Sequence, residues 1–411
     1  MCPHGTHRKS GGRDHMRHQN ALLLAKWLSK PLHQLLLFLA CMICIAKVYK
    51  LRIVFDSNTK DFAGLPSCAE VPNNNAASSV LVSYSYYQKD DIQRSNFEFF
   101  MAVGMGISSG FHPPNNTEFV LVINGDVCDP CTKLLPYLGK DNRYKNLPDI
   151  KKAWSSADVA LLERRENEGM DFAAHNITME WLHWTGQWHK YRHFILLNSS
   201  VRGPFYPSYM GPSWQWTRAF TDRLVGNVKL VSSSLVCLPE VDAGGLGPKA
   251  ESWAFAVDAD ALQLLAKAGV FGMRTCKLCE DGVVVMGEYG LSTVLLKAGH
   301  GIATLMSMYP VGIDWSEERH WRCNNNAHPS RHGTYDGMSM HPFETVFVKA
   351  SWHVGEPHLS HYTRWFLSHA RGDPHTAGRF NEAQYRYAIL PEAQDPNNAS
   401  ACFALAPWHH A

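Results

Sequence analysis

The chain has 411 residues, of which 45% are hydrophobic, and its formal net charge is +2 with histidine neutral. This composition excludes a disordered chain, because disordered chains combine low hydrophobicity with high net charge. The small net charge and the lack of a basic run argue against a nucleic-acid-binding protein, which needs Lys and Arg clusters against phosphates.

The first predicted element is a membrane anchor. Residues 32–49, LHQLLLFLACMICIAKVY, are mostly apolar and nearly long enough to span a bilayer, with Lys47 able to reach the interface. Lys and Arg are more numerous before this segment than after it, which favours a cytosolic N-terminus. A cleaved signal peptide is the alternative, but the preceding polar region is long and no clear cleavage site follows. We therefore expect a cytosolic tail (1–31), an uncleaved signal anchor (32–50) and a stem (51–79).

From residue 80 onwards, strands and helices alternate. Short apolar runs predict strands at 80–87, 118–125, 158–165, 193–198, 228–238 and 300–306. Helical spacing predicts helices at 91–106, 214–224, 258–269 and 289–299, and residues 166–182 are expected to start as a loop and become a helix. This alternation predicts an α/β domain with a mostly parallel sheet covered by helices on both faces. We place that domain at 80–355, and we assign no role to a C-terminal extension at 356–411.

Polar residues end the strand at 193–198. Asn198, Ser199 and Ser200 follow its apolar residues, and Arg202 with the Gly-Pro pair after it stops the strand. Polar side chains at the carboxyl end of a buried strand are where open α/β sheets bind ligands. A turn that only satisfies backbone groups is the alternative.

Cysteines and sequons are typical of a lumenal protein. Two C-x-x-C pairs occur, Cys128/Cys131 and Cys276/Cys279, and disulfides explain them better than zinc, because the pairs lie far apart in sequence. A redox role for the first pair stays open, since it follows a predicted strand. Asn115 and Asn398 lie in loop-like sequons and are candidate glycosylation sites.

The order of the motifs resembles a known family. YSYYQKDD after the first strand, NGD after the second, ENEGMDFAAHN, FILLNSS, ESWAFAVD and GEYGLSTVLLKAG are similar in order to sugar-nucleotide glycosyltransferases of the GT-A type. The similarity is greatest to the rhamnan-synthesis and rhamnosyltransferase branch, including algal Golgi proteins, and covers roughly residues 80–310. Its most specific parts are ENEGMDFAAHN, like the family's N-x-G-x-x-x-A-x-N loop, and LLNSSVRGP, like its N-D-S-x-x-G-P.

The resemblance implies both a fold and an activity. It implies a GT-A-like nucleotide-diphospho-sugar transferase domain that moves a sugar from a nucleotide-sugar donor to a glycan or glycoprotein acceptor. With the predicted anchor, the expected location is the membrane of the Golgi or endoplasmic reticulum, as a single-pass type II protein with a lumenal catalytic domain.

The resemblance also implies a donor site at the ends of four strands. The residues expected to bind the nucleotide sugar are Ser85, Tyr86, Tyr87, Asp126, Arg165, Asn167, Gly169, Asp171, Asn198, Ser200 and Arg202. Asp126 as a turn residue and Asp171 as a helix cap are the structural alternatives.

The acceptor side and the general base come later in the chain. Glu251 and Trp253 lie in a segment that lines the acceptor side in the family. Glu288 precedes a predicted helix, where inverting members of the family place the general base; a carboxylate that only interacts with the helix dipole is the alternative. Asp281 is the nearest competing carboxylate, at the far end of the apolar run that leads to Glu288.

The metal site of this family has no clear counterpart. GT-A enzymes usually hold Mn²⁺ or Mg²⁺ against the diphosphate with an Asp-x-Asp, because a departing diphosphate needs its charge neutralised. The matching residues, 198–200, contain no carboxylate. Either other residues hold a metal, or cationic side chains such as Arg202 neutralise the diphosphate without one.

A histidine-rich segment at 320–353 is a candidate source of a metal ligand, although a polar surface loop is the alternative. Its histidines are His320, His328, His332, His341 and His353, and its Lys349 is a candidate phosphate contact. Two other classes of function therefore stay open beside the enzyme. One is a catalytically inactive, carbohydrate-binding or scaffold protein with the same fold, and the other is a metal binder built on histidine and cysteine.

Overall fold

The computed structural model describes residues 79–107, 111–210, 213–242, 244–326, 328–330, 340–350 and 356–369. All of them belong to one compact unit that begins at Asn74. The predicted tail, anchor and stem up to residue 78, and the end of the chain after residue 369, lie outside the described residues. Within these ranges, no helix is both long and apolar enough to cross a membrane.

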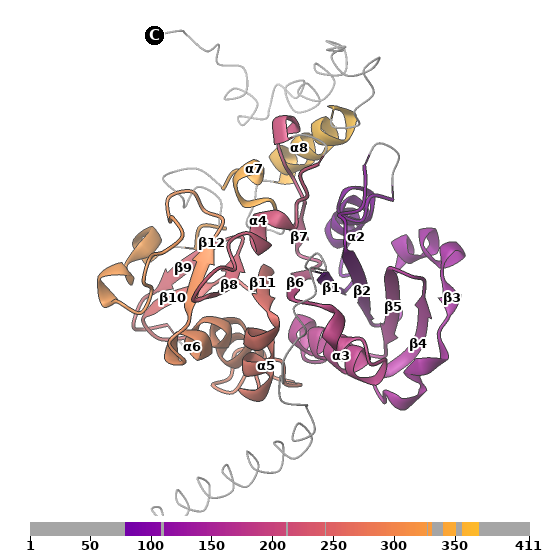
Figure 1. Cartoon of the computed structure of the whole chain (residues 1–411), viewed down its shortest axis with the longest axis horizontal. Helices are drawn as coiled ribbons and strands as arrows, with labels where there is room; N and C mark the ends of the chain where they lie inside the picture. The colour runs from indigo at the N-terminus through magenta and orange to yellow at the C-terminus, as the bar shows by residue number, and fades with distance from the viewer. Residues whose placement is uncertain are drawn as a thin grey trace, which may run out of the picture. The chain divides into compact units, whose positions relative to one another are not determined.

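A nine-stranded mixed sheet forms the centre of the described part (Figure 1). Its order is β12-β8-β11-β6-β1-β2-β5-β4-β3. The strands are β1 (Val80–Tyr86), β2 (Thr117–Asn124), β3 (Gly139–Lys140), β4 (Ile150–Ser155), β5 (Val159–Arg164), β6 (His193–Asn198), β8 (Val228–Ser232), β11 (Ala254–Asp258) and β12 (Gly301–Thr304). The central strands β6, β1, β2 and β5 are parallel, whereas β11 and β4 run antiparallel to their neighbours. The predicted α/β class with a parallel sheet is confirmed for this centre.

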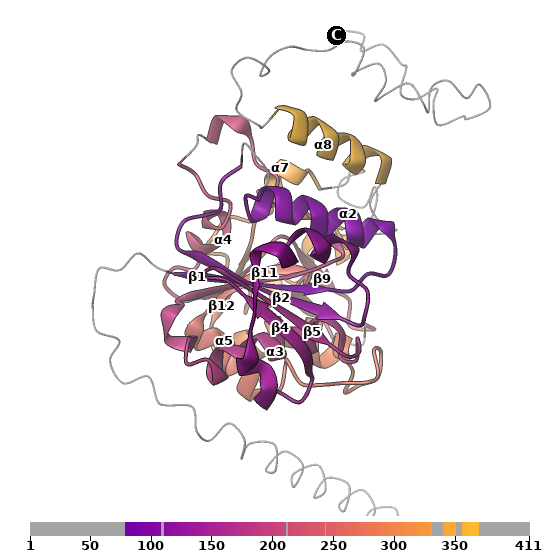
Figure 2. The same cartoon turned by 90° about the vertical axis from the view of Figure 1, so that its right-hand side faces the viewer.

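Helices cover both faces of the sheet (Figure 2). The α-helices are α2 (Asp91–Phe99), α3 (Met170–Trp184), α4 (Arg218–Thr221), α5 (Ala259–Lys267), α6 (Tyr289–Lys297), α7 (Pro342–Thr345) and α8 (Glu356–His369). Shorter helical turns are η1 (Phe100–Gly104), η2 (Asp129–Lys133), η3 (Leu135–Tyr137), η4 (Asn142–Asn146), η5 (Trp188–Lys190), η6 (Ser208–Met210), η7 (Val283–Glu288), η8 (Glu318–His320) and η9 (Cys323–Asn326). Helices α2 and α8 lie on one side of the sheet, and α3 and α5 lie on the other.

Two hydrophobic cores fill the space between the sheet and these helices. Successive side chains of a strand point to opposite faces. In β6, Leu196 therefore packs in the core of α3, α5 and α6, and Leu197 packs in the core of α2 and α4. The same alternation brings Asn198, the last residue of β6, to the α3 side of the sheet.

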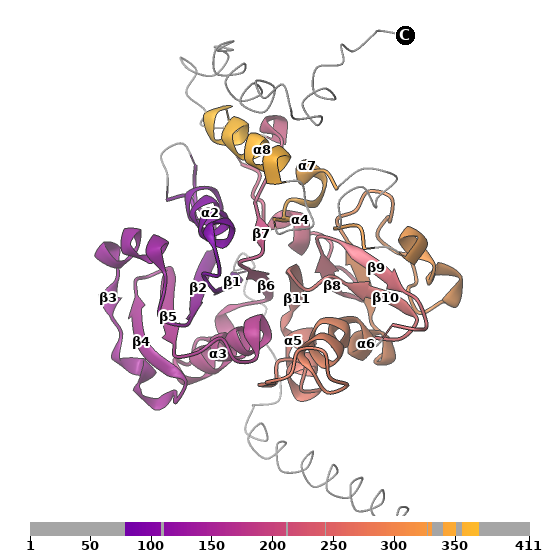
Figure 3. The ribbon, with the colours of Figure 1, turned by 180° about the vertical axis from the view of Figure 1, so that it is seen from behind.

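The predicted strand at 228–238 is wrong as a single element. It divides into β8 and β9 (Leu235–Leu238), and β9 pairs antiparallel with β10 (Gly247–Ala250) in a separate two-stranded sheet. The division falls at buried serines whose hydroxyls donate to backbone carbonyls, such as Ser233 Oγ to the oxygen of Thr345 at 3.0 Å. β10 lies beside α6 (Figure 3), where the Ala250 amide donates to Ser292 Oγ at 2.7 Å.

The segment after β6 forms a second short ribbon. Strand β7 (Val201–Arg202) pairs antiparallel with β13 (Val348–Lys349). The predicted helix at 214–224 is reduced to the four residues of α4. Helix α8, which was not predicted, packs Leu359 and Phe366 against aromatic residues of α2 and of the chain that follows β7.

Three disulfides occur among the described residues. Disulfides were expected without an assignment of partners, and the structure bonds each C-x-x-C internally, as Cys128–Cys131 and Cys276–Cys279. A third bond, Cys237–Cys323, joins β9 to the turn η9. This third bond attaches part of the histidine-rich segment to the two-stranded sheet.

Candidate active site

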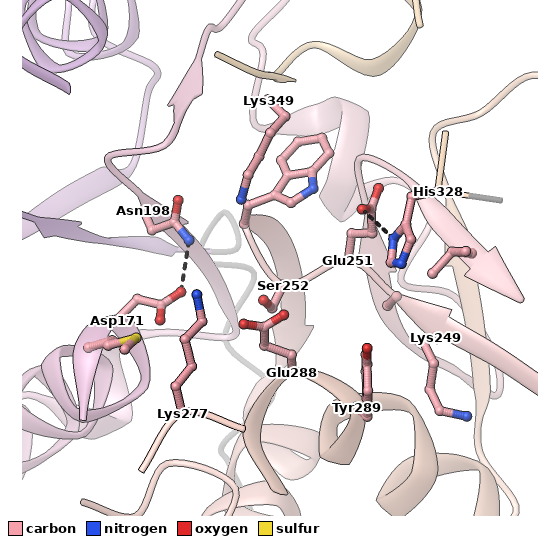
Figure 4. A pocket seen from close by; sticks show the side chains of 14 residues that line it. Asp171, Asn198, Lys249, Glu251, Ser252, Lys277, Glu288, Tyr289, His328 and Lys349 are labelled. Carbon is pink, nitrogen blue, oxygen red and sulfur yellow. Dashed lines mark hydrogen bonds and ion pairs between the residues drawn. The ribbon is translucent and has the colours of Figure 1, made fainter. Parts of the chain in front are cut away.

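A pocket lies at the carboxyl end of β6, next to the first turn of α3 (Figure 4). Its cavity volume is about 220 Å³. Seven residues named from the sequence line it: Asp171, Asn198, Glu251, Trp253, Glu288, His328 and Lys349.

The pocket has two ends with different chemistry (Figure 4). The lysine end is formed by Asp171, Asn198, Lys277 and Lys349, and the histidine end is formed by Glu251, His328, Tyr289 and Lys249. Glu288 and Ser252 lie between the two ends. Lysines outnumber carboxylates at the lysine end, and at the histidine end Lys249 and Glu251 balance in charge, with Glu288 at the boundary.

Asp171 and Asn198 form a fixed pair at the lysine end. Asn198 Nδ2 donates to Asp171 Oδ2 at 2.8 Å, and Asn198 Oδ1 accepts from the amide and the hydroxyl of Ser200 at 3.0 and 2.5 Å. Ser200 therefore orients Asn198 and does not itself line the pocket. Gly169 caps α3 in a left-handed conformation (φ 68°) that favours glycine, which places Asp171 in the first turn of the helix.

Glu288 is the carboxylate best suited to proton transfer. It ends η7, immediately before α6, and is partly buried. Burial and the negative charge of Asp171 raise the pKa of Glu288 to about 7, although Lys349 and Lys277 act in the opposite direction. A general base works best when its pKa lies near the operating pH. The competing residue Asp281 is exposed and does not line the pocket.

Glu251 is held as an anion at the histidine end. Burial alone would raise its pKa, but the bonds from His328, Ser234 and Ser330, with the charge of His328, hold the pKa of Glu251 below its ordinary value. Ser330 Oγ donates at 2.8 Å, and His328 Nδ1 lies 3.4 Å from the carboxylate. Glu251 thereby fixes residues 328–330 against the pocket. The neighbouring Trp253 is buried, and its indole nitrogen has no hydrogen-bond partner within the described ranges.

Other predicted donor residues lie at the ends of neighbouring strands, outside the pocket. Ser85, Tyr86, Tyr87, Asp126, Arg165 and Asn167 do not line it. Ser85 Oγ accepts from Asn124 at 3.0 Å, and the exposed Asp126 pairs with Lys151. Their predicted contacts with the nucleotide stay predictions.

Arg164, which was not predicted from the sequence, connects the end of one strand to a loop near the pocket. Its guanidinium is buried and donates to Asn124 Oδ1 and to the carbonyl of Glu168, both at 2.9 Å. It therefore connects the end of β2 to the loop before α3. The predicted Arg165, one residue later, is exposed because strand alternation turns it away. That alternation was the signal available in the sequence.

Arg202 does not reach the pocket. Its side chain is buried, with Nε donating to Asn96 Oδ1 at 2.8 Å and a second nitrogen donating to Thr363 Oγ1 at 3.4 Å. These partners belong to α2 and α8, so the guanidinium is committed to the opposite side of the sheet. The position of Arg202 therefore does not support its expected contact with a diphosphate.

The cations at the lysine end of the pocket are Lys277 and Lys349. Lys349 was predicted only as a candidate phosphate contact. Lys277 was not predicted, and its one signal in the sequence is its place inside a C-x-x-C pair. Pairing of β13 with β7 brings Lys349 to the pocket, and the Cys276–Cys279 disulfide closes the loop that carries Lys277.

The donor set at the pocket does not fit a hard divalent cation. No group of three or more His, Cys, Asp or Glu side chains that could hold a metal occurs in the described ranges. The Asn198 oxygen already accepts two hydrogen bonds from Ser200, and two lysines face the same space. Of the predicted histidines, His328 contacts Glu251 and His341 caps α7, while His332 and His353 lie outside the described residues.

Comparison with known proteins gives distant structural similarities. No family model matches the sequence, and no curated protein matches it. The mannosyltransferase PcManGT from Pyrobaculum calidifontis, solved in complex with GDP-Man and Mn²⁺, is 13% identical with a TM-score of 0.33, covering 87% of this chain and 93% of that chain. A candidate nucleotide-diphospho-sugar transferase from Desulfovibrio desulfuricans G20 is 10% identical with a TM-score of 0.29, covering 56% of this chain and 80% of that chain.

Proposed function

We propose that the protein is a glycosyltransferase that moves a sugar from a nucleotide-sugar donor to a glycan or glycoprotein acceptor, with the GT-A-like fold that its motifs resemble. The observation that carries this proposal is Glu288, a carboxylate whose pKa is raised to about 7, between the lysine end and the histidine end of one pocket. A carboxylate in this position suits sugar transfer, in which a hydroxyl loses a proton while an anionic diphosphate leaves.

The proposed chemistry uses the two ends differently. The diphosphate of the donor lies at the lysine end, and the acceptor lies at the histidine end. The acceptor oxygen bonds to the anomeric carbon as the bond from that carbon to the diphosphate oxygen breaks. The electron pair leaves with the diphosphate, and Glu288 takes the hydroxyl proton. In this proposal, Asp171 and Asn198 contact the sugar that joins the diphosphate to the acceptor.

A donor screen tests the activity. We expect UDP, GDP or dTDP to raise the thermal unfolding temperature of the full chain, since a ligand that binds only the folded state stabilises it. Hydrolysis of the matching nucleotide sugar should then be measurable across a panel of donors. Binding of free glycans without binding or hydrolysis of any nucleotide sugar would favour the carbohydrate-binding alternative, and stabilisation by metal alone would favour the metal binder.

We also propose that this domain is lumenal, behind an N-terminal signal anchor. Disulfides persist in oxidising compartments, and the three disulfides of the described residues support that location. In sealed microsomes, protease should leave the domain intact until detergent is added. Digestion of the domain without detergent would contradict the proposed orientation.

A further inference from the structure

Lys349 is held at the pocket by the β7–β13 ribbon. Lys349 pairs with Val201 in the ribbon, and the next amide, of Ala350, donates to the carbonyl of Ser200 at 2.8 Å. The ribbon therefore fixes the backbone of Lys349 to the same segment that orients Asn198. Lys349 is in this way held next to the carboxyl end of β6, although it lies far from β6 in sequence.

Lys277 is held by a different structure. The Cys276–Cys279 disulfide closes a short loop around it, and the Val284 amide donates to the Lys277 carbonyl at 3.0 Å. Val284 belongs to η7, which ends at Glu288. The compact turn requires Gly282, since a Cβ there would lie 2.8–2.9 Å from three backbone carbonyl oxygens. Lys277 and Glu288 are thus carried by one rigid segment.

Both ammonium groups are available to a ligand. Among the described residues, no carboxylate lies within the 4.0 Å limit of an ion pair with Lys277 or Lys349. These two lysines outnumber the carboxylate of Asp171 at the same end of the pocket, so the end attracts an anion. Lysine is a compact phosphate-binding charge, and two of them supply the same charge as one divalent cation.

We propose that Lys277 and Lys349 bind the diphosphate of the donor in place of a divalent cation. The inference rests on the proposed function, which supplies the diphosphate. It explains why 198–200 contains no carboxylate and why the Asn198 oxygen is occupied by Ser200. At this end two lysines outnumber the one carboxylate, Asp171, so a diphosphate meets a net positive charge, with Glu288 beside it as the next carboxylate.

Calorimetric titration of the full chain with UDP, GDP and dTDP tests this inference. With EDTA present, we expect the best of the three to bind. Replacing EDTA with Mn²⁺ should change its Kd less than threefold, or about 0.7 kcal/mol. Lys277→Gln and Lys349→Gln should each weaken binding about 10- to 100-fold, the effect typical of one charge-assisted hydrogen bond. Lys349→Arg should restore most of the affinity, because it restores the charge.

Lys140→Gln, at an exposed position on β3, is the matched control and should leave the Kd unchanged. Binding that requires Mn²⁺ and is insensitive to both pocket lysines would overturn the inference while leaving the glycosyltransferase proposal intact. Absence of nucleotide binding under every condition would overturn both. Circular dichroism of each variant checks that the fold is retained.

Discussion

Glu288→Gln is expected to lower kcat by about 10²–10⁴-fold, the range for loss of a general base, while donor affinity changes little. An acceptor hydroxyl does not ionise near neutral pH, so its attack needs a group that takes the proton as the new bond forms. Glutamine keeps the shape of the side chain and cannot accept that proton. Glu288 lies between the two ends of the pocket, so its loss should affect turnover more than binding.

The pH dependence gives the same residue a second test. The pKa of Glu288 is raised to about 7, and a base acts only when ionised, so kcat/KM should rise as pH increases through about 7. The Gln variant should lose this rise. Steady-state rates between pH 5 and pH 9, measured with the donor found by the screen, provide the comparison.

The free energy of unfolding of the Gln variant shows whether a loss of activity comes from a loss of folded protein. The neutral form of Glu288 is favoured in the folded state, so its stabilising contribution is present below the ordinary pKa of 4.5 and is lost as pH rises through about 7. Above that pH, the Gln variant should be at least as stable as the wild type.

Asp281→Asn, at an exposed site outside the pocket, is the control for the Glu288→Gln prediction and should keep normal turnover. A kcat for Glu288→Gln within about tenfold of wild type would remove Glu288 from the mechanism.

Gly203→Ala should strongly destabilise the fold around the lysine end. Gly203 has φ of 155°, and a Cβ there would lie 2.5 Å from the Phe347 ring and from the Val346 carbonyl oxygen. We expect about 1–3 kcal/mol from the unfavourable backbone conformation and about 1–3 kcal/mol from overpacking. Moving residues 346–347 would also displace Lys349, so nucleotide affinity should fall with stability.

Gly226→Ala is the matched control for this substitution. Gly226 has a left-handed φ of 59°, but no atom lies within 4 Å of the position of its Cβ. It should therefore lose only the backbone contribution and keep nucleotide affinity. Urea denaturation of both variants measures the difference, and equal midpoints for the two would show that the contact between Gly203 and residues 346–347 does not matter.

Local patterns were sufficient for most of the central elements. Apolar runs and helical spacing predicted the strands of the parallel centre and the helices α2, α3, α5 and α6, because each has a complete apolar face within one segment. The same patterns failed at β8 and β9, where three buried serines divide one apolar run between two sheets. They also failed at α8, whose buried Leu359 and Phe366 pack in a cluster with residues of distant segments, such as Phe99 and Phe205.

The sequence by itself determined the end of β6, the first turn of α3 and the position of Glu288 before α6, because each follows from where a strand or helix must begin or end. Only the tertiary structure decided which cations meet these residues. Arg202, close to Asn198 in sequence, is directed to α2 and α8, whereas Lys277 and Lys349 reach the pocket through a disulfide loop and a ribbon. Strand ends are local properties of the chain, but the charges around a carboxylate, and hence the raised pKa of Glu288, depend on contacts between segments far apart in sequence.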